Sequence, residues 1–256
     1  MARAAFFDLD KTILDTSSNV ALSGPFIEAG LMTRRTAIAS VLVQLPYLLA
    51  GADESRMEQM AEAMGRMGRG WNAAFLEATV EDALERTIAP VCYAQALRRI
   101  AYHKSIGDVV VIASASVEEV VRPIATMLGA DEVLASKAAV DDDGCFTGEV
   151  IHFNQAQGKA DACAQLARAH GWDLSQCSAY SDSVSDAPLL RLVGHPYAVN
   201  PDRALREMAE REGWPTLTFS STVRVLPRRV PTPAKVAVPF VVGVAVGVAA
   251  CALARR

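Results

Sequence analysis

The stretch "AAFFDLDKTILDT", residues 4 to 16, joins a short apolar run to two closely spaced carboxylates. The apolar pattern predicts a first strand over residues 3–8 that ends at Asp8. Side chains at positions i and i+2 of an extended segment point to one side, so Asp8 and Asp10 can face a common site. Ligands of open α/β sheets bind at the carboxyl ends of the strands, which is where these two residues would lie.

A calcium-binding loop and a solvated acidic turn are the other interpretations of these carboxylates. A helix–loop–helix calcium site would need glycine at loop position 6 and glutamate at position 12, where the chain has Ile13 and Asn19. The calcium loop is therefore disfavoured, whereas the acidic turn stays open on these residues alone.

The rest of the chain supplies the partners of the first strand. Continuous or alternating apolar runs predict further strands over residues 107–116, 132–136, 176–182 and 195–200. Helical patterns fall between and after them, over residues 116–130, 158–171, 185–194 and 202–213, and Ser116 and Glu119 match a capping box. Residues 138–150 predict a hairpin that turns at Asp143 and Gly144.

Alternation of strands and helices predicts an α/β fold with a Rossmann-like parallel sheet covered by helices on both faces. Residues from about 19 to 104 are helical in pattern and contain nothing that resembles a parallel strand. We therefore expect a catalytic core made of residues 1–15 and 106–225, with an inserted α-helical cap over residues 16–105. An insert at the carboxyl end of the first strand would cover the site.

Charge and cysteine usage restrict the class of partner and the compartment. The chain has 256 residues and a net charge of −4, without the basic stripe or domain that nucleic-acid binding requires, so we expect no nucleic acid as a partner. Its 5 cysteines are scattered and form no C-x-x-C pair, which is typical of reduced thiols. The first residues do not resemble a secretory signal, so we expect the catalytic domain in the cytoplasm.

The C-terminal segment is apolar after a proline-rich, basic linker at residues 226–235. Residues 236–254 are 19 residues without a charge, and Arg255 and Arg256 follow them. About 20 apolar residues cross a bilayer as a helix, so the segment predicts a transmembrane helix that anchors the chain to a membrane. A buried C-terminal helix is the alternative, because Pro239 interrupts the segment. Gly243 and Gly247 form a G-x-x-x-G that predicts a homodimer through this tail.

A second acidic pair, Asp182 and Asp186, follows another predicted strand. Two such pairs on neighbouring strand ends would form a carboxylate cluster that needs a cation, and oxygen ligands favour Mg²⁺. Ser114 ends a strand at the same edge, and Lys159 begins a helix. Carboxylates, a hydroxyl, a lysine and Mg²⁺ together predict a site for a phosphoryl group.

Four stretches, "FFDLDKT", "VIASAS", "GKADA" and "YSDSVSDAPLL", occur in this order between residues 6 and 190. They resemble the four motifs of the haloacid dehalogenase superfamily, in particular its phosphoserine-phosphatase-like subfamily IB. The helical insert between the first two motifs is similar to the cap of that subfamily. The resemblance implies a Mg²⁺-dependent phosphatase, a phosphoric monoester hydrolase that works through an aspartyl-phosphate.

The resemblance also implies a role for each motif residue. Asp8 would be the nucleophile, and Asp10 would protonate the leaving alcohol and then accept a proton from water. Ser114 and the backbone N–H of Ala115 would hold phosphoryl oxygens. Lys159 would neutralise the nucleophile and the phosphoryl charge.

The metal site and its surroundings follow from the same resemblance. Asp8, Asp182 and the main-chain carbonyl of Asp10 would bind Mg²⁺. Thr12 would orient Asp10 or its loop, and Asp186 would act through a bound water or through Lys159.

The substrate is indicated by departures from the family pattern. Phosphoserine phosphatases have a glutamate nine residues after the nucleophile that binds the substrate's amino group, and Ser17 stands there in this chain. Met57, Met60, Met64 and Met67 share one predicted helical face, typical of a packed core or of a pliable apolar pocket. We expect a small or amphiphilic, lipid-like phosphomonoester as substrate. A phosphotransferase to an alcohol, or an inactive membrane-tethered binding protein, is the alternative.

Overall fold

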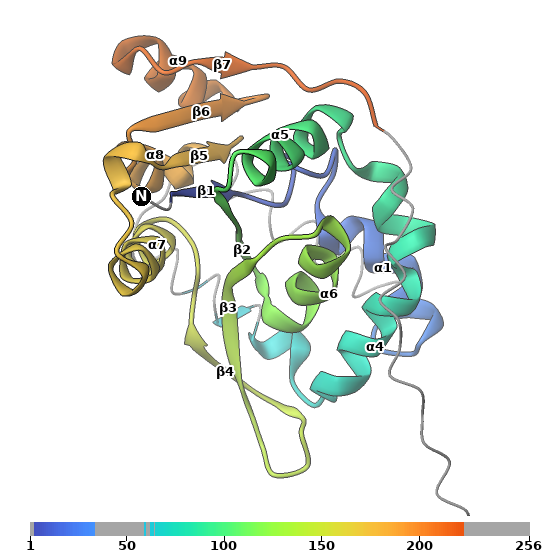
Figure 1. Ribbon diagram of the computed structural model, residues 1–256. Coiled ribbons are helices and arrows are strands. Elements are labelled where there is room, and N and C mark those ends of the chain that lie inside the picture. The colour runs from blue at the N-terminus through green and yellow to red at the C-terminus, as the bar shows by residue number, and fades with distance from the viewer. Residues whose placement is uncertain (1–2, 34–58, 60–61, 64, 223–256) are drawn as a thin grey trace, which may run out of the picture.

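The computed structural model describes residues 3–33, 59, 62–63 and 65–222. Figure 1 shows a twisted central sheet with helices on both faces. The strands are β1 (Ala4–Phe7), β2 (Val109–Val117), β3 (Glu132–Val140), β4 (Phe146–His152), β5 (Ser178–Ser181), β6 (His195–Val199) and β7 (Thr216–Leu217). The α-helices are α1 (Ser18–Glu28), α4 (Ala73–Ala83), α5 (Ala94–Ser105), α6 (Glu118–Leu128), α7 (Gln157–His170), α8 (Ala187–Leu192) and α9 (Arg203–Glu212). Shorter helices are the π-helix η1 (Leu84–Ile88) and the 3-10 helices η2 (Ala89–Val91), η3 (Leu174–Gln176) and η4 (Val184–Asp186).

The sheet confirms the predicted α/β class. Its strand order is β4-β3-β2-β1-β5-β6-β7, and every neighbouring pair is parallel except β3 and β4. β1 lies in the middle, with Phe7 opposite Ile112 of β2 on one side and Tyr180 of β5 on the other. The residue after Phe7 therefore lies between β2 and β5, near the carboxyl end of β5.

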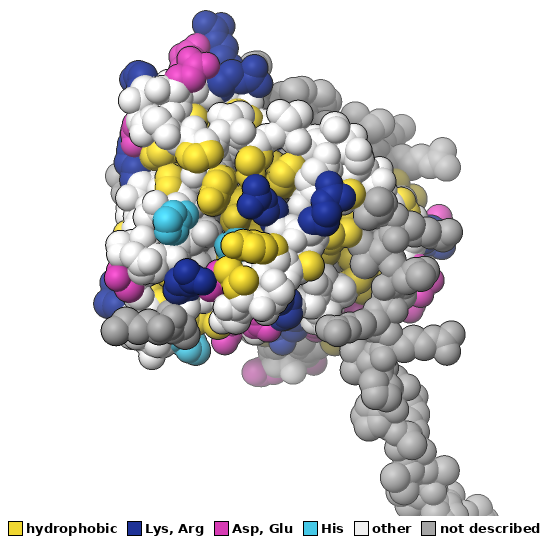
Figure 2. All heavy atoms as spheres, turned by 45° about the horizontal axis from the view of Figure 1, so that its top comes forward, with side chains coloured by type: hydrophobic (Ala, Val, Ile, Leu, Met, Phe, Trp, Pro, Cys, Tyr) yellow, Lys and Arg dark blue, Asp and Glu magenta, His cyan; other side chains and the backbone are white. Residues whose placement is uncertain are grey.

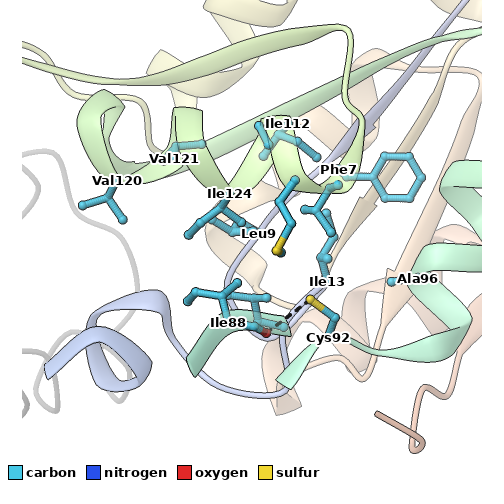
Figure 3. Close-up of a cluster of buried hydrophobic side chains, with 14 of the residues drawn as sticks. Phe7, Leu9, Ile13, Ile88, Cys92, Ala96, Ile112, Val120, Val121 and Ile124 are labelled. Carbon is cyan, nitrogen blue, oxygen red and sulfur yellow. Dashed lines mark hydrogen bonds between the residues drawn. The ribbon is translucent and has the colours of Figure 1, made fainter. Parts of the chain in front are cut away.

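Alternate side chains of β1 supply two hydrophobic cores, one on each face of the sheet. Ala5 and Phe7 belong to the core that also contains residues of α5, α6 and the cap. Figure 3 shows this cluster, in which Phe7 and Leu9 lie near Ile112 and Ile124. Phe6 packs on the other face, against residues of α7, α8 and α9. Burial on both faces explains the unbroken apolar run "AAFF".

Most of the described cap consists of α1, α4, η1 and η2, which contact one another beside the sheet edge. The sequence range expected for the cap, residues 16–105, also includes α5. This helix packs on the sheet, because Ala96 and Ile100 are in the core with Phe7. Its His103 bonds Asp108 at 2.8 Å and the Tyr180 hydroxyl at 2.9 Å. We therefore describe α5 with the core.

The predicted hairpin forms from β3 and β4, with Gly144 in the left-handed region at φ 75°. Its tip pairs with the cap: the Gly70 N–H donates to the Phe146 carbonyl at 2.8 Å, and the Ala73 N–H donates to the Gly144 carbonyl at 2.9 Å. Asn72 stands opposite Cys145 in this antiparallel contact. The hairpin thus connects the edge of the sheet to the cap.

The capping box expected at Ser116 and Glu119 is wrong. β2 continues to Val117, and α6 begins at Glu118 without a side-chain cap. The Ser116 hydroxyl instead lies 3.2 Å from the Ser18 hydroxyl of α1. A contact distant in sequence therefore takes the hydroxyl that the local pattern assigned to the helix.

Figure 2 shows hydrophobic side chains, with Lys and Arg among them, gathered over α5 and strands β6 and β7. Tyr102 and Ile106, in and just after α5, are 53% and 43% exposed.

No helix within the described ranges is long and apolar enough to cross a membrane. The expected linker at residues 226–235 and the anchor at residues 236–254 lie outside the described residues.

Candidate active site

Asp8 directly follows the central strand and is held between its neighbours. Its N–H donates to the Tyr180 carbonyl of β5 at 3.0 Å, which continues the strand pairing by one residue. The chain then turns, because the N–H groups of Ile13 and Leu14 both donate to the Leu9 carbonyl at 3.0 Å. This turn, in which Lys11 has a left-handed φ of 59°, brings the Thr12 hydroxyl to 3.2 Å from Asp8 Oδ2.

Lys159 binds two of the predicted carboxylates at once. Its Nζ lies 2.8 Å from Asp8 Oδ1 and 2.8 Å from Asp186 Oδ2, and all three residues are buried. The first turn of α7 places Lys159 there. The Ser181 hydroxyl donates to Asp186 Oδ2 at 2.7 Å. Asp186 thus contacts Lys159, through which it was expected to act if not through a bound water.

Burial and like charge make this cluster unfavourable without a cation. Burial, together with the charge of Asp186, raises the pKa of Asp8 to about 7 despite Lys159. Burial and the charges of Asp8 and Asp186 raise the pKa of Asp182 well above its ordinary value. Burial alone would lower the pKa of Lys159, but Asp186 and Asp8 outweigh it and raise that pKa. Lys159 stays charged, and without a further cation Asp8 and Asp182 hold protons more readily than ordinary carboxylates do.

The residues fit a hard cation such as Mg²⁺. The atoms that they offer to a metal ion are carboxylate oxygens. One of these, Asp186 Oδ1, is buried without a hydrogen-bond partner in the described part of the chain. That part contains no group of three or more acidic, His or Cys side chains placed to hold a metal ion. Mg²⁺ often uses only one or two carboxylates and keeps several waters. Asp8 and Asp182, with the main-chain carbonyl of Asp10, would supply such a small set of oxygen ligands.

Asp10 has a different environment from Asp8. The Ser18 N–H donates to Asp10 Oδ1 at 2.8 Å, and the Ser18 hydroxyl donates to Oδ2 at 3.3 Å. Burial raises the pKa of Asp10 more than these hydrogen bonds lower it. A raised pKa lets a carboxyl group hold a proton for a leaving group. Ser18, which the motifs did not indicate, orients Asp10.

Thr12 differs from its expected role. Its hydroxyl donates to Asp8 Oδ2 at 3.2 Å and lies 3.5 Å from Asp182 Oδ1, so it orients the nucleophile rather than Asp10. The turn that follows Leu9 is the reason, because it brings Thr12 back over Asp8.

Ser114 and Ala115 lie at the carboxyl end of β2, at the same sheet edge as Asp8. The Ser114 Oγ accepts a hydrogen bond from the Ser116 N–H at 3.2 Å, so its own proton can be donated elsewhere. The amide of Asn154 donates to the Ser114 carbonyl at 2.9 Å, and the Ser136 hydroxyl donates to the Ala115 carbonyl at 2.7 Å. These two contacts hold the expected phosphate-binding segment in place.

Asn154 and Ser136 were not found by sequence reasoning. Asn154 is completely buried and lies shortly before the "GKADA" motif, and Ser136 lies in β3. Ser136 Oγ also accepts from the Asn154 N–H at 3.0 Å. Their positions in sequence give no signal, because each acts through a residue about 20 to 40 positions away.

Comparison with known proteins agrees with this geometry. The family model of haloacid dehalogenase-like hydrolases matches residues 5–191. The "Inhibition of morphological differentiation protein" of Streptomyces azureus is 46% identical over 89% of this chain and 82% of its own length. A probable phosphatase of Mycobacterium tuberculosis is 44% identical over 99% of this chain and 89% of its own length.

A solved structure of phosphoserine phosphatase as a phospho-aspartyl intermediate analogue has the same fold. It is 18% identical, with a TM-score of 0.63, over 87% of this chain and 96% of that one. The family match covers the cap, the core as far as residue 191 and every predicted site residue. The chain belongs to the haloacid dehalogenase-like hydrolases and is a phosphatase of that family.

Proposed function

We propose that the protein is a Mg²⁺-dependent phosphomonoester hydrolase that works through a phosphoryl group carried on Asp8. The observation that supports this most is the Lys159 bridge between Asp8 and Asp186, with both contacts at 2.8 Å. Among the described residues, the bridge leaves Asp8 Oδ2 with a single hydrogen bond, which the Thr12 hydroxyl donates. A carboxylate that is fixed by a lysine and a threonine is positioned to attack a phosphorus atom.

Asp8 and Asp10 have different roles in this reaction. An oxygen of Asp8 forms a bond to phosphorus while the bond from phosphorus to the alcohol oxygen breaks, and Asp10 gives its proton to that alcohol. Asp10, now a carboxylate, accepts a proton from a water whose oxygen attacks the phosphorus and releases Asp8 and inorganic phosphate. The raised pKa of Asp10 supports the first proton transfer.

Lys159, Ser114 and the Ala115 N–H would stabilise the phosphoryl oxygens, since positioning and charge contribute most of such reactions. Mg²⁺ bound by Asp8, Asp182 and the Asp10 carbonyl would add positive charge beside these oxygens. This ion would also remove the unfavourable interaction between Asp8 and Asp182.

Hydrolysis of an aryl phosphate tests the proposal. With Mg²⁺ present, Asp8→Asn should lower kcat by on the order of 10³-fold or more, because an amide is a poor nucleophile. The matched control is Asp15→Asn, which changes an exposed acid of the same loop and should keep activity. Equal activity of wild type and Asp8→Asn would exclude the covalent route.

We also propose that residues 236–254 tether the protein to a membrane with its catalytic domain in the cytoplasm. The support is the uncharged length of this segment and its basic flanks. Deletion of residues 230–256 should move the protein from the membrane fraction to the soluble fraction with activity kept. If the truncated protein still sediments with membranes, the tether lies elsewhere.

A further inference from the structure

An apolar cavity of about 120 Å³ lies between the cap and the core. Its lining includes Phe26, Trp71 and Leu76 of the cap. Val117 at the end of β2 and Val120 of α6 line it from the core. Met67, from the methionine face predicted to form either a packed core or an apolar pocket, is also in its lining, whereas Met57, Met60 and Met64 lie outside the described residues. The cavity is therefore built largely from hydrocarbon and aromatic surface.

The cavity adjoins the side of the site where the leaving group departs. Asn19 and Val117 are in its lining, and each directly follows one serine of the Ser18–Ser116 contact. Ser18 is the residue that holds Asp10, the proton donor to the leaving oxygen. An alcohol protonated by Asp10 thus has the cavity next to it.

The phosphate-binding side of the site touches the same cavity. Ser136 is in the lining, and its hydroxyl donates to the Ala115 carbonyl. A phosphoryl group at Ser114 and Ala115 and an organic group in the cavity would be neighbours. One molecule can therefore occupy both places.

Charge in the cavity is nearly absent. Lys137 is the single charged residue among the described lining residues, and its side chain is 60% exposed and 3.8 Å from Glu118. Two cap arginines are paired at the surface instead, Arg66 with Glu62 and Arg86 with Glu28. An ammonium group buried here would have no carboxylate partner among the described lining residues, at a high desolvation cost.

We propose that this cavity binds the alcohol part of the substrate, so that the preferred substrates are phosphate monoesters of apolar alcohols. The inference rests on the proposed function and specifies its substrate class. Each methylene that enters the cavity should raise kcat/KM about fourfold, because burial of apolar surface favours the bound state. The rise in kcat/KM should stop once the alkyl group of the substrate fills the cavity.

Linear alkyl phosphates from methyl to octyl phosphate, with phosphoserine, test the inference on the full-length protein with Mg²⁺. We expect kcat/KM to rise from methyl to hexyl phosphate and to exceed that for phosphoserine. Val120→Thr, which puts a hydroxyl into the cavity at constant shape, should lower the ratio of hexyl to methyl phosphate. Val121→Thr is the matched control, because Val121 is buried next to Val120 but is not in the cavity lining. The ratio of kcat/KM for hexyl phosphate to that for methyl phosphate should equal the wild-type ratio in this variant.

The outcomes separate this inference from the proposed function. Hydrolysis of every ester at one kcat/KM, or a preference for phosphoserine, would overturn the inference and leave the hydrolase intact. A chain-length effect that Val120→Thr and Val121→Thr change equally would place the alkyl group elsewhere. No hydrolysis of any ester would overturn the hydrolase itself.

Discussion

Asn154 shows how one buried side chain can control a catalytic segment without touching substrate. Its amide donates to two carbonyls, those of Ser114 and Leu134, each at 2.9 Å. These bonds join β2 and β3 to the loop before α7. The loop in turn positions Lys159, so the phosphate-binding segment and the lysine share one support.

We expect Asn154→Ala to lower both stability and turnover. Loss of the two buried hydrogen bonds should reduce the free energy of unfolding by about 2–3 kcal/mol, because two carbonyls lose their partner. Denaturant unfolding and kcat measure the two effects. Asn200→Ala is a suitable control, since its amide bonds the Phe219 backbone at 2.8 and 2.9 Å but not Ser114 or Ala115. A fall in kcat no larger than that of the control would contradict the positioning role.

The sequence predicted the reactive residues better than the residues that hold them. Asp8, Asp182 and Lys159 lie in short motifs at strand and helix ends, where local pattern and sheet edge agree. The resemblance implied that Thr12 orients Asp10 or its loop, whereas its hydroxyl contacts Asp8 and Asp182, because of the turn after Leu9. Ser18 and Asn154 act through contacts distant in sequence, and no local pattern marks such contacts.

At the scale of elements, α7 carries Lys159 into the site from a tightly fitted start. A Cβ on Gly158 would lie 2.6 Å from the Phe153 carbonyl, which is backbone and cannot move aside cheaply. Ala156, just before the helix, has φ 50° and ψ −121°, an unusual conformation for a residue with a side chain. The register of this helix is thus constrained by backbone contacts.

Gly158→Ala should shift the start of α7 and lower kcat by about tenfold or more, because small displacements of a catalytic group are costly. Gly171→Ala at the other end is the matched control: Gly171 has φ 67° and open space around it. That change should cost about 1 kcal/mol of stability and leave kcat unchanged. Steady-state kinetics and thermal unfolding of both variants measure these effects. Equal kcat values for Gly158→Ala and Gly171→Ala would show that Lys159 tolerates the shift.

Element boundaries were predictable where pattern and tertiary structure agree. β1, β5 and the hairpin match their apolar runs and turn residues closely. α6 begins later than its capping box suggested, because Ser116 remains in β2 and contacts Ser18. The helical pattern of α5 revealed its type but not its neighbours, so its packing on the sheet emerged only from the structure.

At the scale of the molecule, the cap and the β3–β4 hairpin form one unit. Besides the bonds of Gly70 and Ala73, the Phe146 N–H donates to the Trp71 carbonyl at 2.9 Å. Gly65 packs against the Gly148 carbonyl so closely that a Cβ there would lie 2.2 Å from it. Opening of the cap away from the hairpin would break all of these contacts, so we expect the two to move together.

A disulfide can test this. Asn72 and Cys145 form a non-hydrogen-bonded antiparallel pair, whose Cα atoms are usually about 4.5 Å apart and within disulfide range. Asn72→Cys should therefore form a disulfide with Cys145 on oxidation. The bond should raise the free energy of unfolding by about 2–4 kcal/mol over the reduced form of the same variant. Turnover should not change, and loss of activity that a reductant restores would show that the cap must leave the hairpin.

The pairing of cap and hairpin also affects how the sheet meets other chains. Unpaired edges of sheets recruit strands from other molecules and lead to aggregation. Here the strand β7 at one edge has only two residues, Thr216 and Leu217, and the cap pairs with the start of β4 at the other. Within the described residues, the contact between cap and hairpin thus also covers the start of the β4 edge, where a strand of a second copy could otherwise pair.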